Sequence, residues 1–127
     1  MKVIKNKKDL YKNLKKYFNE EREVFVSLHL NNKNKIVDET LITIGDFNGC
    51  HFDYSYLLDR SLKCNLNNKG KIVFAHSHTN KTLNPSKKDL ETTSIIKEMG
   101  IKYKVNIVDY LIFNDKTVRS YKDDKIQ

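Results

Sequence analysis

The sequence predicts an α/β fold, a three-layer mixed sheet with helices on both faces and the element order α-β-β-α-β-α-β-β. Three observations predict it. Apolar residues alternate along residues 23–30, which is typical of a strand. Residues 71–75 are nearly all apolar, which indicates a central strand buried on both faces. Segments with helical spacing of apolar residues separate the strands, and helices that connect strands of one sheet pack on its faces.

The first part of the chain predicts a basic helix and a hairpin. The helix is expected at about residues 7–18, with one apolar stripe and a lysine-covered back. The strand at 23–30 is followed by an asparagine-rich turn at 31–34 and a partner strand at 35–44. The apolar stripe of the helix consists of Leu10, Leu14, Tyr17 and Phe18.

The second part predicts two further helices and three strands. Ser86 is expected to be the N-cap of a helix with Asp89 at its N3 position, and Gly100 is expected at the C′ position. The other predicted elements are, in chain order, a loop at 45–53, a helix at about 54–66, the strand at 71–75, a polar loop at 76–85, and strands at 103–113 and 117–121.

Composition indicates a single domain over residues 1–127. The hydrophobic fraction is 39%, the charged fraction 31%, and there are 4 glycines and 1 proline, which excludes collagen-like and low-complexity chains. No apolar run approaches the ~18 residues of a membrane span, and no apolar segment of a secretory signal follows the basic start. Cys50 and Cys64 form no disulfide framework. We therefore expect a cytoplasmic protein that does not bind membranes.

The charge leaves nucleic acid open as a partner. The 24 Lys and Arg against 16 Asp and Glu give a net charge of +8. A basic surface attracts nucleic acid, anionic membranes or acidic proteins. Lysine dominates this charge, whereas arginine is the usual residue for reading bases and binding phosphate through two hydrogen bonds. Charge alone therefore does not predict nucleic-acid binding.

One group of polar residues predicts a metal site. His76 and His78 are two residues apart at the end of the buried strand, so they point to the same side. Asp89 lies one turn into the next helix, and two imidazoles with a carboxylate are a common ligand set for catalytic zinc. The alternatives are a chance histidine pair and a plain capping box of Ser86 and Asp89. In that box, Asp89 would turn back to the Ser86 amide and not toward the histidines.

These residues resemble the motif of the JAMM/MPN metallopeptidases. That motif is an upstream glutamate, then His-x-His, seven residues, Ser, two residues and Asp. The chain matches it without a gap. The matching residues are Glu23, His76, His78, Ser86 and Asp89.

The surrounding sequence is similar to the bacterial RadC-type branch of that family, over about residues 20–121. The similar segments are 22–28, 84–86 and 107–112. The chain departs from the pattern at Ser77, where RadC-type proteins usually have Asn, and at Thr79, where the family commonly has Pro. The resemblance implies the MPN fold, which shares its element order with the zinc cytidine deaminases. Deamination itself is not expected, because the chain lacks the His-x-Glu and Pro-Cys-x-x-Cys motifs.

The resemblance also implies a mechanism. It assigns His76, His78 and Asp89 to Zn²⁺, Ser86 to the oxyanion, and Glu23 to the general base that acts on a metal-bound water. From the residues alone, Glu20 and Glu21 compete with Glu23, and the resemblance selects Glu23. For His29 and His51 we expect core, surface or loop roles.

The predicted function is therefore zinc-dependent hydrolysis of an amide bond by a peptidase or isopeptidase. The substrate is expected to be a protein or peptide, including an isopeptide or a ubiquitin-like tail. The first alternative is a RadC-like, DNA-associated accessory protein of the DNA-repair type, supported by the net charge of +8 and the lysine-rich first helix. A metal-dependent nuclease and a metal-binding interaction module also remain open.

Overall fold

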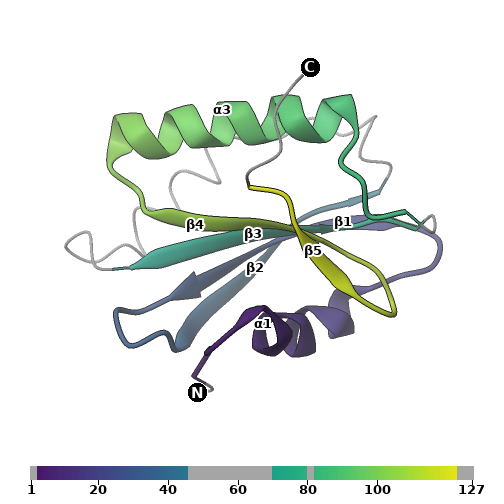
Figure 1. The fold of residues 1–127 in the computed structure, drawn as a ribbon, viewed down its shortest axis with the longest axis horizontal. Coiled ribbons are helices and arrows are strands. Elements are labelled where there is room, and N and C mark those ends of the chain that lie inside the picture. Colours follow the sequence, from purple (N-terminus) through teal and green to yellow (C-terminus); the bar gives the residue numbers. More distant parts are fainter. Residues whose placement is uncertain (1–2, 46–69, 80–81, 123–127) are drawn as a thin grey trace.

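A computed structural model describes residues 3–45, 70–79 and 82–122 of the chain (Figure 1). The predicted helix at about 54–66 lies outside these ranges, as do Cys50, His51 and Cys64. The described elements are α1 (Lys7–Leu14), the 3-10 helix η1 (Lys15–Tyr17), β1 (Glu23–Leu30), β2 (Ile36–Gly45), β3 (Lys71–Ser77), α3 (Lys87–Tyr103), β4 (Ile107–Phe113) and β5 (Val118–Ser120).

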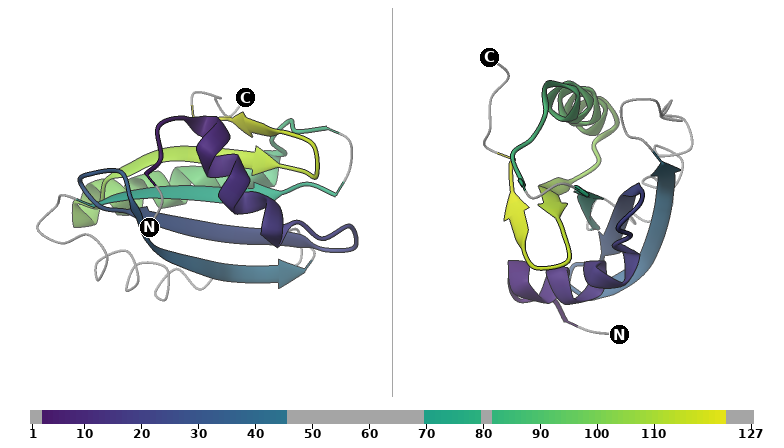
Figure 2. Two further views of the ribbon diagram at one scale, coloured as in Figure 1. Left: turned by 90° about the horizontal axis from the view of Figure 1, so that it is seen from below. Right: turned by 90° about the vertical axis from the view of Figure 1, so that its right-hand side faces the viewer.

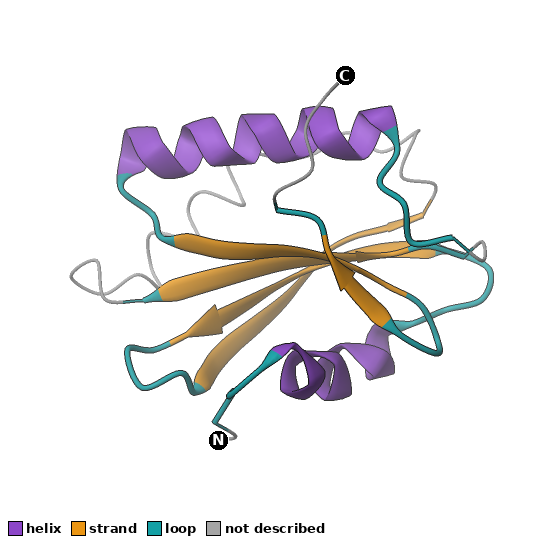
Figure 3. Cartoon of the chain, viewed as in Figure 1, coloured by secondary structure: helices purple, strands orange, loops and turns teal. Residues whose placement is uncertain are grey.

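The described strands form one mixed sheet, as predicted. Its five strands lie in the order β2-β1-β3-β4-β5. Strand β1 is antiparallel to β2 and β3, β3 is parallel to β4, and β4 is antiparallel to β5. Helix α3 makes the crossover between the two parallel strands, which a hairpin turn cannot connect (Figure 3). In this crossover, the start of α3 lies close to the end of β3.

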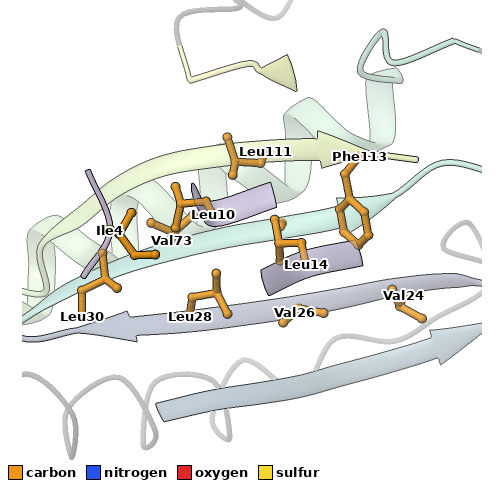
Figure 4. Packing of buried hydrophobic residues seen from close by; sticks show 11 residues of the cluster. Ile4, Leu10, Leu14, Val24, Val26, Leu28, Leu30, Val73, Leu111 and Phe113 are labelled. Carbon is orange, nitrogen blue, oxygen red and sulfur yellow. The ribbon is translucent and has the colours of Figure 1, made fainter. Parts of the chain in front are cut away.

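Helices cover both faces of the sheet. Figure 2 shows α1 on one side of the sheet and α3 on the other. The α1 face is an apolar cluster in which Leu10 and Leu14 meet alternate residues of β1, including Val26 and Leu28 (Figure 4). The α3 face is a second cluster, centred on Phe25, Phe74, Ile96, Tyr110 and Ile112. All four predicted stripe residues pack on the α1-side cluster. The helix is shorter than the predicted 7–18, because Tyr17 lies in η1 and Phe18 follows it in an extended conformation.

Strand β1 has the predicted bounds but is more deeply buried than the alternating pattern suggests. Its second face, which carries Phe25, Ser27 and His29, is as buried as its apolar face. The reason is that this face also packs against other residues, since Phe25 belongs to the buried α3-side cluster with Phe74 and Ile96. His29 is therefore a core residue, and its Nε2 lies 3.0 Å from the Ser27 hydroxyl.

The end of α3 differs from the prediction. The helix continues through Gly100 to Tyr103, and β4 begins only at Ile107, so the predicted strand start at Tyr103 is wrong. The left-handed residue is Lys104, with φ of 57°. Gly100 has a packing role instead. A Cβ there would lie 2.9 Å from Ile107 Cδ1 and 3.2 Å from the Val105 carbonyl oxygen, so glycine lets the chain leaving the helix pass close by.

A polar cluster around Glu39 joins the first helical segment to β2. Glu39 Oε1 accepts hydrogen bonds from Asn13 Nδ2 at 2.6 Å and from the Tyr17 hydroxyl at 3.0 Å. Lys16 Nζ lies 3.1 Å from Glu39 Oε2. Burial, followed by the hydrogen bond to Glu39 and the charges of Glu39 and Asp38, raises the pKa of Tyr17 to about 12.

Alkaline pH is therefore expected to weaken the fold through Tyr17. A pKa raised from 10.0 to about 12 stabilises the folded state below pH 10, and this contribution is lost as the pH rises through about 12. Urea unfolding at several pH values between about 9 and 12 measures the loss. Tyr17→Phe is expected to show a shallower decrease over this range. A decrease as steep as in the wild type would exclude Tyr17 as a responsible group.

None of the described helices is long and apolar enough to cross a membrane.

Candidate metal centre

The end of β3 and the start of α3 bring three potential ligand atoms together. His76 Nε2 lies 3.0 Å from His78 Nε2 and 3.2 Å from Asp89 Oδ2. His78 Nε2 lies 3.0 Å from the same Asp89 oxygen. All three residues are buried, with exposed fractions of 0%, 6% and 2% for His76, His78 and Asp89. The structure thus brings together the two histidines and the carboxylate that the sequence singled out.

This triangle suits one metal ion. Zinc bound tetrahedrally at ~2.0–2.1 Å has neighbouring ligand atoms ~3.3 Å apart. The three observed separations of 3.0, 3.0 and 3.2 Å are close to that spacing. Two imidazoles and a carboxylate also match the donor chemistry of catalytic zinc sites and of several other divalent metals. Among the described residues, this is the group of histidine and acidic side chains that could hold a metal ion.

The same carboxylate oxygen also caps α3. Asp89 Oδ2 accepts a hydrogen bond from the Ser86 amide at 2.8 Å, and Ser86 Oγ accepts one from the Asp89 amide at 3.0 Å. The predicted capping box is therefore confirmed. The expectation that a capping Asp89 would turn away from the histidines is wrong, because Oδ2 contacts the Ser86 amide and both imidazoles at once.

The pKa shifts of His76 and Asp89 favour the protonation states of metal ligands. Burial lowers the pKa of His76, which favours the neutral ring. Burial would raise the pKa of Asp89, but hydrogen bonds from His76 and His78 outweigh it and hold this pKa well below its usual range. For His78, burial is outweighed by hydrogen bonds to Asp89 and to the Thr82 carbonyl, so its pKa is raised. An ionised carboxylate and a neutral imidazole are the forms that bind metals.

Each imidazole also has contacts away from the three ligand atoms. His76 lies between the parallel ring of Phe25, with centroids 6.2 Å apart, and the edge-on ring of Tyr121 at 5.7 Å. Its Nδ1 is 3.5 Å from the Tyr121 hydroxyl. His78 Nδ1 lies 3.1 Å from the carbonyl oxygen of Thr82. Neither Tyr121 nor Thr82 could be predicted from the sequence, since no local pattern links them to the histidines.

Glu23 lies at the start of the neighbouring strand, on the face of the sheet that carries His76. In the antiparallel pairing of β1 and β3, Phe25 lies opposite His76. Glu23 is two residues before Phe25, so its side chain projects from the same face. It is half-buried, and its charge contributes to the raised pKa of His78. The competing Glu20 and Glu21 precede β1 and are exposed.

Ser77 fixes β1 at this point. Ser77 lies between His76 and His78 in the sequence, and its side chain is buried. Its Oγ accepts a hydrogen bond from the Val24 amide at 2.9 Å. This bond ties the start of β1, beside Glu23, to the end of β3. Ser77 is therefore a positioning residue, a role that its place between the two histidines in the sequence does not reveal.

Replacement of Ser77 is expected to destabilise the fold. Ser77→Ala leaves the buried Val24 amide without its acceptor, which costs about 1–3 kcal/mol of unfolding free energy. Urea denaturation of the metal-free protein measures this cost without a contribution from ligands. Ser94→Ala on α3 is the matched control and is expected to change stability by less than about 0.5 kcal/mol. Equal effects of the two variants would contradict a specific role for the Ser77 hydrogen bond.

Ser86 lies beside the ligand triangle as the N-cap of α3. It is exposed, and its hydroxyl oxygen accepts the Asp89 amide, which leaves the hydroxyl proton available for donation. The five sequence-predicted site residues therefore lie at adjoining ends of β1, β3 and α3. The charge of Glu23 contributes to the raised pKa of His78.

The fold is α/β, with a mixed sheet, and two histidines and an aspartate converge beside the central strand of that sheet. This is the arrangement of a JAB/MPN domain. The family model described as "RadC-like JAB domain" matches residues 4–126. The chain therefore belongs to the RadC-like JAB domain family.

Curated relatives agree with this assignment. A UPF0758 protein of Aquifex aeolicus is 26% identical over 123 residues, which cover 97% of this chain and 52% of the relative. A UPF0758 protein of Flavobacterium johnsoniae is 29% identical over 127 residues, 99% of this chain and 54% of the relative. One from Staphylococcus haemolyticus is 30% identical over 99 residues, 78% and 42% respectively. The chain thus spans about half the length of these relatives, and their shared name states no activity.

Proposed function

We propose that this chain is a zinc-dependent metallohydrolase of the JAMM type that cleaves an amide bond in a protein or peptide, including an isopeptide. The observation that carries the proposal is the buried triangle of His76 Nε2, His78 Nε2 and Asp89 Oδ2, with the Glu23 charge acting on it from the neighbouring strand. A structural zinc site normally has four protein ligands, whereas this set offers three and matches the pattern of catalytic sites.

The residues divide the chemistry between them. His76, His78 and Asp89 would hold the metal, which when bound acts as a Lewis acid and lowers the pKa of water to about 7. Glu23 takes a proton from the attacking water and delivers it to the leaving amine, a role that requires a carboxylate close to the metal but not bound to it. The Ser86 hydroxyl donates a hydrogen bond to the oxygen of the tetrahedral intermediate.

The first test is metal content. We expect protein purified without a histidine tag to bind about one equivalent of zinc, and His78→Ala to bind much less. The loaded protein is then incubated with a library of peptides and isopeptides, and cleavage is followed by mass spectrometry. Absence of zinc uptake would contradict the proposal. Zinc uptake without cleavage of any amide would instead favour a metal-binding interaction module.

A DNA-associated accessory role is the second candidate, and the surface of α1 favours it. Leu10 and Leu14 face the sheet, while the lysines of the helix and of η1 are exposed. Binding through such charges weakens steeply with salt, so a mobility shift at low and high salt tests the idea. No shift even at low salt would exclude it. The exposed lysines are Lys7, Lys8, Lys12, Lys15 and Lys16.

We propose the cytoplasm as the location of either activity, because Cys50 and Cys64 form no disulfide framework in the sequence.

A further inference from the structure

The two candidate histidine ligands have outer nitrogens with different supports. Both rings direct Nε2 toward Asp89, which leaves Nδ1 pointing away from the ligand triangle. A metal-binding imidazole usually donates its second N–H to an acceptor that fixes its tautomer and orientation. For His78 this acceptor is the Thr82 carbonyl at 3.1 Å, and for His76 it is the Tyr121 hydroxyl at 3.5 Å.

Tyr121 is held in place from two directions. Its amide donates to the Tyr110 carbonyl at 2.9 Å, which keeps it beside β4. Its hydroxyl lies 3.1 Å from Thr93 Oγ1, and Thr93 Oγ1 is 2.9 Å from the Asp89 carbonyl oxygen. With one proton on each hydroxyl, the bonds can run from His76 Nδ1 to Tyr121, from Tyr121 to Thr93, and from Thr93 to Asp89. This buried chain connects the outer side of one candidate ligand to the backbone of another.

Arg119 supports the other histidine through the loop. Its Nη1 donates to the Leu83 carbonyl at 3.2 Å. Leu83 directly follows Thr82, whose carbonyl faces His78. Arg119 pairs with Ile112 in the β4–β5 register and is two residues from Tyr121, so both side chains project from the α3 face of the sheet.

We infer that Arg119 and Tyr121 are positioning residues for the metal centre, with Tyr121 orienting His76 and Arg119 orienting His78 through the loop at 82–83. The inference rests on the proposed function, because it concerns how the ligands of that metal are held. It assigns a role to the β4–β5 hairpin, which otherwise only closes the edge of the sheet. Each residue acts on one ring, so the two effects can be separated.

The test uses the zinc-loaded full chain and a signal from each ring. Long-range ¹H–¹⁵N spectra report the Nδ1–H proton of each imidazole, and competition with a chelator reports zinc affinity. Tyr121→Phe is expected to shift or broaden the His76 Nδ1–H signal, to leave the His78 signal in place, and to weaken zinc binding by about 10–100-fold. Arg119→Ala is expected to shift or broaden the His78 Nδ1–H signal and to leave the His76 signal in place. Arg119→Lys is expected to restore part of the affinity, since an ammonium can still donate to the Leu83 carbonyl.

Tyr110→Phe is the matched control. Its ring lies 6.1 Å from that of Tyr121 in the same apolar cluster, but no hydrogen bond joins its hydroxyl to either histidine in the described structure. It is expected to keep both Nδ1–H signals and the wild-type zinc affinity. If Tyr121→Phe and Arg119→Ala match this control while the wild type binds zinc, the inference is overturned and the proposed function stands. If the wild type binds no zinc, both are overturned.

Discussion

Glu23→Gln is expected to lower the rate of amide hydrolysis by about 10²–10⁴-fold while the protein still binds one equivalent of zinc. Glutamine keeps the size of the side chain but cannot accept a proton. Zinc uptake is expected to persist because Glu23 is outside the triangle formed by His76, His78 and Asp89. The measurement is a cleavage rate at matched zinc content, with the substrate found in the library search.

A nearby glutamate provides the control for that result. Glu21→Gln removes the same charge two residues earlier, at an exposed position before β1. It is expected to leave the cleavage rate within about twofold of the wild type, because surface substitutions away from the site change little. A wild-type rate in Glu23→Gln would remove Glu23 from the mechanism. An equal loss in both variants would point to general charge effects.

Zinc is expected to stabilise the folded chain through the same triangle. A ligand that binds only the folded state adds about 2.7 kcal/mol to the unfolding free energy at a free concentration 100 times its dissociation constant. Urea unfolding with and without zinc measures this increment. His78→Ala is expected to lose most of it, since one of the three ligand atoms is removed.

The shared role of Asp89 makes Ser86→Ala an informative control for this experiment. Loss of the Ser86 cap costs about 0.5–2 kcal/mol. That cost is expected with and without zinc, so the increment produced by zinc stays near its wild-type value. A loss of the increment in Ser86→Ala would mean that the cap, and not the ligand set alone, holds Asp89 in place. An unchanged increment in His78→Ala would exclude this triangle as the zinc site.

The sequence predicted the parts of the fold and site that depend on local pattern. The β1 strand shows period-2 alternation, and Ser86 with Asp89 has the spacing of a capping box, so both were visible without tertiary information. The His-x-His pair and Asp89 also follow from short spacings. Glu23 was different, because several acids precede β1 and only the family resemblance singled one out.

The features that sequence analysis missed arise from packing between distant segments. Burial of both faces of β1 depends on packing in the α1-side cluster on one face and in the α3-side cluster on the other. The end of α3 was misplaced because Gly100 is typical of a helix end, whereas here it allows a close passage of the chain and Lys104 adopts the left-handed conformation. Tyr121 lies 45 residues from His76 in the sequence, and no periodicity connects them.

The uneven register of β1 has a consequence for how this domain can change during evolution. Its pairing with β2 is irregular at two places, between Phe25 and Val26 and between His29 and Leu30, whereas its pairing with β3 is continuous. Single-residue insertions and deletions can therefore be absorbed on the β2 side. A one-residue slip against β3 would turn Glu23 to the opposite face and bring apolar Val24 to its place. We expect homologues to vary in length in the β2 hairpin and to conserve the number of residues between Glu23 and the end of β1.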